Sequence, residues 1–166
     1  MGCTLGEHFR MLARYNRIAN ERLYRACAAL DDGEYRKARD GSFFSVHGTL
    51  NHILLGDRVW MARFEGSGRY TPPLAGILFD DFGALREARQ REDARIELFM
   101  SGLAEGFFAG TIEYVNSEGS ARADPAAVAV AHLFNHQTHH RAEVQTMLRQ
   151  AGVKPPSLDM HRAIYP

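Results

Sequence analysis

The sequence is poor in cysteine, has no long hydrophobic run and carries no excess of either charge. Its 166 residues include two cysteines, Cys3 and Cys27, which lie far apart and form no CxxC pair. We therefore expect two reduced thiols in a cytoplasmic protein rather than a disulfide framework. No apolar stretch approaches about 18 residues, so no transmembrane helix is predicted.

The charge balance and the missing motifs exclude further classes of protein. Lys plus Arg and Asp plus Glu each number 20, which gives a formal net charge of zero. A nucleic-acid-binding protein would usually carry a basic excess. The opening segment MGCTLGEHFR has no basic region followed by an apolar stretch, so we expect no signal peptide. The sequence also lacks an HExxH motif, a P-loop and a GxSxG elbow.

Apolar residues recur at spacings of three and four in four segments, which predicts amphipathic helices. The predicted helices span roughly residues 4–30, 45–65, 81–104 and 125–150. Ser45 is a candidate N-cap of the second, and Asp124 is one for the fourth, with Pro125 at its first helical position. Residues 107–123 alternate between apolar and polar side chains, which indicates a short hairpin or an extended loop before the last helix.

Four amphipathic helices in a chain of this length indicate an all-α four-helix bundle that forms a single domain over residues 1–166. The connections are long for a simple up-and-down bundle, so we expect a crossover connection. The middle of the third predicted helix reads REARQREDARIE. We interpret this charged run as a solvated helix face, because such runs usually are.

Histidines gather in one short segment of the last predicted helix. Four of the eight histidines fall within HLFNHQTHH, and they are His132, His136, His139 and His140. At about 100° per residue all four lie on one side of a helix. Two imidazoles four residues apart can bind one metal ion. Both His132/His136 and His136/His140 have this separation, so the spacing leaves the pair open and makes His136 the common member.

A third ligand should come from another helix, since catalytic zinc sites commonly use three protein ligands and one open position. His52 is the best candidate. Gly48 and Gly56 lie one turn to either side of it and leave room for a partner helix or a ligand to approach. Asp57 lies near the apolar stripe and could hold a ligating imidazole in one tautomer. Imidazole suits zinc, nickel, copper and iron, so the ligand type does not name the metal.

Three segments together resemble the DinB-like family of damage-inducible bacterial proteins. They read YNRIANERLY, SVHGTLNHILLGDRVWMARFEG and HLFNHQTHHRAEVQTMLRQAG. The resemblance implies a four-helix bundle with a crossover, a homodimer, and a metal bound by three histidines. It assigns the histidine of LNHIL to His52 and those of H-x-x-x-H-R to His136 and His140. His132 and His139 would then line the pocket or support the ligands.

One departure from the family pattern follows this motif. Many members continue with Arg-Gly-Gln, whereas this chain has Arg141-Ala142-Glu143. Glu143 lies one turn from His139 and His140 on the metal side. It is the candidate catalytic residue, either as a general base or as an acid that supports a ligand. Arg141 would either contact an anionic group of a substrate or serve the structure.

The resemblance also implies what the protein does. The cofactor would be a divalent transition metal, with zinc or nickel expected first and iron or manganese as alternatives. Related proteins are thiol transferases, which join a low-molecular-weight thiol to an electrophile, so a small-molecule substrate is expected. A metal-dependent hydrolase and a non-enzymatic metal-binding stress-response protein are the two alternatives. No nucleic-acid or membrane partner is expected.

Overall fold

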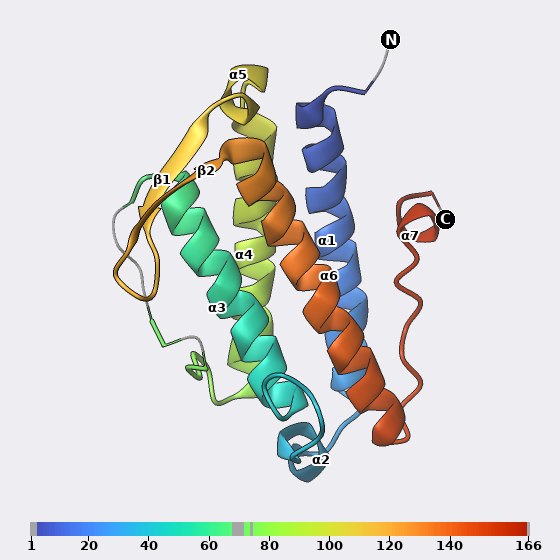
Figure 1. Cartoon of the computed structure of the whole chain (residues 1–166). Helices are drawn as coiled ribbons and strands as arrows, with labels where there is room; N and C mark the ends of the chain where they lie inside the picture. The colour runs from blue at the N-terminus through green and yellow to red at the C-terminus, as the bar shows by residue number, and fades with distance from the viewer. Residues whose placement is uncertain (1–2, 68–71, 74, 166) are drawn as a thin grey trace.

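The computed structural model describes residues 3–67, 72–73 and 75–165, and four long helices form its body (Figure 1). They are α1 (Leu5–Cys27), α3 (Val46–Phe64), α4 (Phe82–Gly102) and α6 (Ala126–Gln150). The connections between them hold α2 (Asp32–Arg36), α5 (Glu105–Phe108), β1 (Thr111–Val115) and β2 (Ala121–Pro125), and α7 (Met160–Ile164) follows α6. The all-α fold predicted from the sequence is confirmed. Within these residues no helix combines the length and the apolar character needed to cross a membrane.

The long helices form a bundle in which each packs beside two others, in the ring order α1, α4, α3, α6. Figure 1 shows that α1 and α6 run in one direction while α3 and α4 run in the other. Because α3 and α4 are parallel, α4 begins at Phe82 at the end of the bundle opposite to the one where α3 ends at Phe64. This is the crossover that the long connections led us to expect.

The helix ends differ from the predicted ones by a few residues, and one predicted cap was wrong. Ser45 does cap α3, since its hydroxyl accepts a hydrogen bond from the backbone N–H of Gly48 at 2.9 Å. Asp124 does not cap α6, because it belongs to β2 and accepts a hydrogen bond from the Tyr114 hydroxyl at 2.6 Å. Pairing with β1 keeps the chain extended as far as Pro125, which delays the start of α6.

The segment before α6 forms the antiparallel hairpin that its alternating pattern indicated. Its register pairs Thr111 with Pro125 at one end and Val115 with Ala121 at the other. β1 packs against α3, so the hairpin covers one end of the α3–α6 pair. This position brings Tyr114 within reach of side chains on α3.

Two apolar cores fill the bundle, one toward each end. The core nearer α5 and the hairpin includes Phe9, Ala13, Met61, Ile96, Met100, Leu133 and Phe134. The core nearer α2 includes Leu23, Leu50, Ile53, Leu54, Leu85, Val144 and Met147. Each long helix contributes to both cores, since its apolar stripe runs along most of its length.

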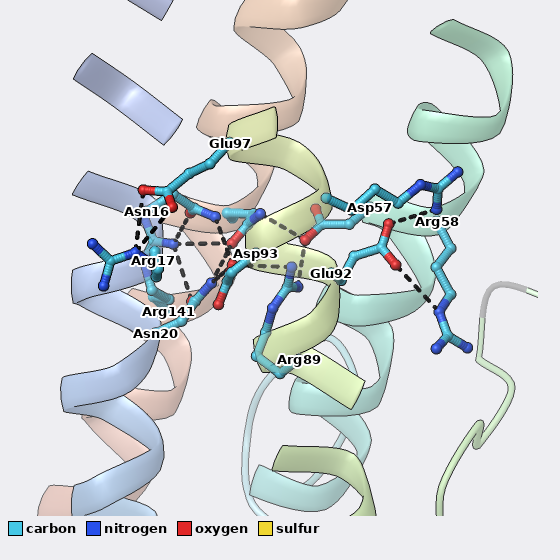
Figure 2. Close-up of polar contacts among 12 residues, drawn as sticks. Asn16, Arg17, Asn20, Asp57, Arg58, Arg89, Glu92, Asp93, Glu97 and Arg141 are labelled. Atoms are coloured by element: carbon cyan, nitrogen blue, oxygen red, sulfur yellow. Dashed lines mark hydrogen bonds and ion pairs between the residues drawn. The ribbon is translucent and has the colours of Figure 1, made fainter. Parts of the chain in front are cut away.

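A layer of buried polar side chains separates the two cores and draws on all four long helices (Figure 2). We call it the polar layer, and it comprises Asn16, Asn20, Asp57, Arg89, Asp93, Gln137 and Arg141. Arg89 forms an ion pair with Asp57, and its Nη2 lies 3.1 Å from Oδ1 of Asp93. Asn20 donates to that same oxygen of Asp93 at 2.9 Å.

The polar layer corrects part of the prediction that the charged middle of α4 faces solvent. Arg86, Glu87 and Arg91 are exposed as predicted, but Arg89 is 1% exposed and Asp93 is 2% exposed. These two can be buried because the facing helices supply amides and a carboxylate at the same level of the bundle. Glu92 is buried as well and pairs with Arg58 and Arg95. Arg141 belongs to the structural alternative, since it is buried and donates to Asn16, Gln137 and other polar-layer groups.

Candidate metal centre

Three histidines meet where α3 packs against α6, halfway along the bundle. Nε2 of His52 lies 2.9 Å from Nε2 of His136. One ring nitrogen from each of His52, His136 and His140 lies within 4.8 Å of the other two. His52 and His140 are buried and His136 is half-buried. The structure thus brings together the three residues predicted from the sequence, in a group that could hold a metal ion.

Two glycines on α3 allow this close approach. A Cβ atom at Gly56 would lie 2.7 Å from Cε1 of His136, so a larger residue would displace that ring. A Cβ atom at Gly48 would overlap the backbone carbonyl of Phe43. The space predicted on either side of His52 is therefore taken by α6 at one glycine and by the preceding loop at the other.

The loop before α3 covers one side of the cluster. The ring of Phe43 stacks on His52, with ring centroids 3.6 Å apart and planes inclined by 16°. The loop is tied to α6 because the hydroxyl and the backbone N–H of Ser42 donate to Oε1 of Glu143, at 2.7 and 3.3 Å. Sequence reasoning missed both residues, since an irregular loop has no periodic pattern to reveal which side chains point inward.

Glu143 supports His140 from behind. Its Oε2 lies 2.7 Å from Nδ1 of His140, which leaves the other ring nitrogen available to face His52 and His136. Burial raises the pKa of Glu143, but the hydrogen bonds from His140 and Ser42 outweigh it and the net pKa is lowered. An ionised carboxylate at this place favours the tautomer of His140 that carries its proton on Nδ1.

His136 is held in the neutral form that a metal ligand needs. Burial first, and then repulsion from His140 and His52, lowers the pKa of His136 to about 3. Its Nδ1 is buried and has no hydrogen-bond partner in the described part of the chain. Since an unpaired buried nitrogen costs free energy, His136 is poorly explained as a residue that only completes the fold.

The spacing of the cluster suits a small cation with nitrogen ligands. A tetrahedral ion about 2.0–2.1 Å from each nitrogen separates its ligands by about 3.3 Å. The 2.9 Å between His52 and His136 is within a few tenths of an ångström of that value. His139, His140 and Glu143 form a second possible group, but His139 is exposed and Glu143 is already bonded to His140 and Ser42. The buried histidine group therefore fits a metal better.

Two other predicted contributors lie apart from the cluster. His132 is exposed, and its ring centroid lies 5.9 Å from that of His136 and 5.1 Å from that of Trp60. Asp57 does not hold a ligand imidazole as predicted, because its Oδ2 accepts from Arg89 and from Gln137 and its Oδ1 has no hydrogen-bond partner among the described residues. Burial raises the pKa of Asp57 to about 7, and Arg89 opposes that rise.

A cavity of about 350 Å³ opens beside the histidines, within the size range of small-molecule sites. It is lined by His52, Gly56, Val59, Trp60, Arg63, Pro72, Tyr114, Asn116, Ser117, His132 and His136. Trp60, predicted as part of the apolar stripe, packs against the core and also lines this cavity. Tyr114 reaches it from the hairpin, so the cavity depends on an element distant in sequence from α3.

Comparison with known proteins shows the family of the chain from its sequence and a matching fold from its structure. A model of the DinB family matches residues 2–166. Protein DinB from Bacillus subtilis (strain 168) is 26% identical over 150 residues, which cover 85% of this chain and 84% of that protein. The crystal structure of a DinB-like protein from Bacillus cereus ATCC 10987 aligns with a TM-score of 0.64 at 16% identity and covers 84% of this chain and 89% of that one. The chain therefore belongs to the DinB family, as the three sequence segments predicted.

Proposed function

We propose that the protein binds one divalent transition metal through His52, His136 and His140 and joins a low-molecular-weight thiol to a small electrophile beside it. The observation that carries the proposal is the convergence of three imidazoles at the wall of a cavity. Two of them, His52 and His136, also line that cavity. Zinc or nickel is the expected metal, because neutral imidazole nitrogens suit both ions, and iron or manganese are the alternatives.

The ligands determine what chemistry is available. Three neutral imidazoles leave the charge of a divalent ion uncompensated, and that charge would favour a thiolate over a thiol in the cavity. The thiol proton passes to solvent. The thiolate sulfur then forms a bond to the electrophilic carbon, and the leaving group departs with its electron pair. Phe43 and the hairpin exclude part of the solvent from this step.

Glu143 contributes by orienting His140. The 2.7 Å contact to Nδ1 and the two bonds from Ser42 fix the carboxylate in place. Loss of such a supporting group typically lowers metal affinity or activity by about 10- to 100-fold. Glu143→Gln should therefore weaken metal binding. The general-base role predicted from the sequence stays a prediction, and it would instead lower the rate at unchanged metal content.

The metal assignment is tested first by metal analysis. Purified protein should carry near-stoichiometric metal, and His136→Ala should abolish it. His132→Ala is the matched control, because His132 lies one turn away on the same helix and outside the close group. Metal retained unchanged in His136→Ala would overturn the assignment.

The reaction is tested separately, with holoprotein, a bacterial thiol and a model electrophile. Metal-dependent conjugate formation that stops when the thiol is omitted supports transfer. Product formed equally without thiol would show hydrolysis, for which the same three histidines would serve. No product in either assay would leave a metal-binding protein without turnover, the stress-response alternative.

A homodimer, expected from the family resemblance, is part of the same proposal. It requires no change in the histidine cluster, since all three members come from one chain. Sedimentation of the purified holoprotein distinguishes a dimer of 18.6 kDa chains from a monomer. A monomer at all concentrations would remove this part of the proposal and leave the metal site untouched.

A further inference from the structure

Arg63 lies on the cavity wall and contacts two aromatic rings. Its guanidinium carbon lies 4.1 Å from the ring centroid of Tyr114 and 4.5 Å from that of Trp60. The two rings meet edge to face, with centroids 5.5 Å apart. Contacts with two rings that come from different elements hold the guanidinium in one orientation and leave N–H groups at its edge for a ligand.

No acid pairs with this arginine within the described residues. The nearest carboxylate influence comes from Asp124, whose Oδ2 accepts a hydrogen bond from Tyr114 and which forms no ion pair with Arg63. Other arginines of the chain that lie near acids do pair, such as Arg17 with Glu97 and Arg95 with Glu65. Partial burial lowers the pKa of Arg63. A half-buried cation without a counter-ion is a natural place for an anion to bind.

The rest of the cavity lining that the structure describes has no negative charge. Among the described residues, Arg63 is the one lining side chain with a permanent charge, and the others are histidines, aromatics, small residues and amide or hydroxyl groups. Burial, and then the charge of Arg63, lowers the pKa of His132, so this histidine is neutral as well. A divalent metal at the histidines would add further positive charge to the same cavity.

We propose that Arg63 is the anion-binding residue of this cavity and that the occupant is a small organic carboxylate. A single guanidinium edge matches one carboxylate in a two-bond arrangement. A phosphate dianion would call for additional donors, and the described lining supplies no lysine or second arginine. Trp60 and Tyr114 would contact the carbon skeleton next to the carboxylate.

The inference deepens the proposed function and rests on it for the identity of the substrate. The histidines and Arg63 line one cavity, so a molecule anchored by its carboxylate at Arg63 would extend its other end toward the metal. One of the two reactants, either the thiol or the electrophile, would then carry the carboxylate. The arginine acts as a specificity-determining residue and takes no part in bond making.

The test uses Trp60, which is the single tryptophan of the chain and lines the cavity. Its fluorescence is followed while chelator-treated protein is titrated with phenylacetate, with the neutral isostere phenylacetamide, or with inorganic phosphate. We expect saturable binding of phenylacetate, with affinity falling by about 10- to 100-fold for the amide, which lacks the charge-assisted hydrogen bonds. Phosphate should bind more weakly than phenylacetate.

Three variants make the result specific to Arg63. Arg63→Gln should bind phenylacetate and phenylacetamide equally weakly, and Arg63→Lys should retain part of the preference for the acid. Arg58→Gln is the matched control, since Arg58 also lies on α3 over an aromatic ring, 5.4 Å from the centroid of Phe79, but does not line the cavity. It should bind like the unmodified protein, and circular dichroism confirms that all three variants are folded.

The outcomes separate this inference from the proposed function. No saturable binding of phenylacetate, equal binding of acid and amide, or wild-type binding by folded Arg63→Gln would each overturn the inference. Phosphate binding more tightly than phenylacetate would overturn the choice of carboxylate. Because the probe has no thiol and the protein no metal, these results stand whether or not the metal assay succeeds.

Discussion

Two clusters of polar residues, the polar layer and the histidine cluster, lie side by side halfway along the bundle. They differ in whether their side chains find hydrogen-bond and ion-pair partners. Along α6, Gln137 and Arg141 face the interior, while His136 and His140, one residue before each, face His52 on α3. In the polar layer, opposite charges and amides pair with one another across four helices. In the histidine cluster, three imidazoles point at one another, and the one acid bonded to them, Glu143, lies behind His140.

This difference indicates which of the two clusters can bind a ligand or a metal ion. A buried network with paired charges and amides is costly to disturb and offers little to a ligand. Two of the three neutral imidazoles, His52 and His136, can share one hydrogen bond, and a cation between the three rings would add interactions that the protein alone lacks. The polar layer thus fixes how the four helices are aligned along the bundle axis. That alignment places His52 on α3 beside His136 and His140 on α6.

The largest expected effect comes from breaking the polar layer. Arg89→Met leaves Asp57 and Asp93 buried without their shared cation, and such changes typically cost about 3–5 kcal/mol. Urea unfolding would measure the loss. The matched control is Arg91→Met on the same helix, because Arg91 is exposed and pairs with the exposed Glu87 one turn away. The control should cost about 1 kcal/mol or less. Equal losses in the two variants would show that the layer is no more important than a surface pair.

Metal addition should stabilise the cluster and leave the polar layer unaffected. A ligand that binds only the folded state at about 100 to 1,000 times its dissociation constant adds about 2.7–4.1 kcal/mol. Thermal unfolding with and without chelator would show this gain. Replacing His52 or His140 by alanine should remove it, whereas Arg91→Met should keep it. A gain that survives loss of either histidine would place the metal elsewhere.

Acid should weaken the metal-free protein through His136. The pKa of this residue falls from its usual 6.5 to about 3 on folding, so below pH 6.5 the unfolded chain takes up a proton that the folded chain refuses. Stability is therefore present above pH 6.5 and is lost as the pH falls toward 3. From about pH 7 to about pH 5 the loss due to this residue should be about 1–2 kcal/mol. His136→Asn should show a shallower pH dependence by that amount, and an unchanged slope would contradict the assignment.

What the sequence predicted well is what local spacing encodes. The long helices follow from apolar residues three and four apart, and His136 and His140 share a face because they are one turn apart. His52 came from a second segment, but its two flanking glycines marked a place of close approach, which Gly56 and His136 bear out.

What the sequence did not predict depends on the packing of distant elements. Arg89 and Asp93 looked solvent-exposed because their partners Asn20 and Asp57 lie on two other helices. The spacing of Trp60 and Arg63 is visible as a pair one turn apart, and it could have suggested a cation–π contact. The second ring over Arg63 comes from the hairpin, and nothing in the sequence of α3 indicates it.

The smallest expected effect tests how closely α6 approaches α3. Gly56→Ala places a methyl group 2.7 Å from Cε1 of His136 and should displace that ring. We expect a loss of about 1 kcal/mol from overpacking together with weaker metal binding. The control is Gly102→Ala at the end of α4, where a Cβ atom meets nothing within 4 Å. There the better helix former should add up to about 1 kcal/mol and leave metal affinity unchanged. A loss of stability in Gly56→Ala together with a gain in Gly102→Ala would show that Gly56 makes room for the ring of His136. Unchanged metal affinity in Gly56→Ala would show that the ring does not need this space.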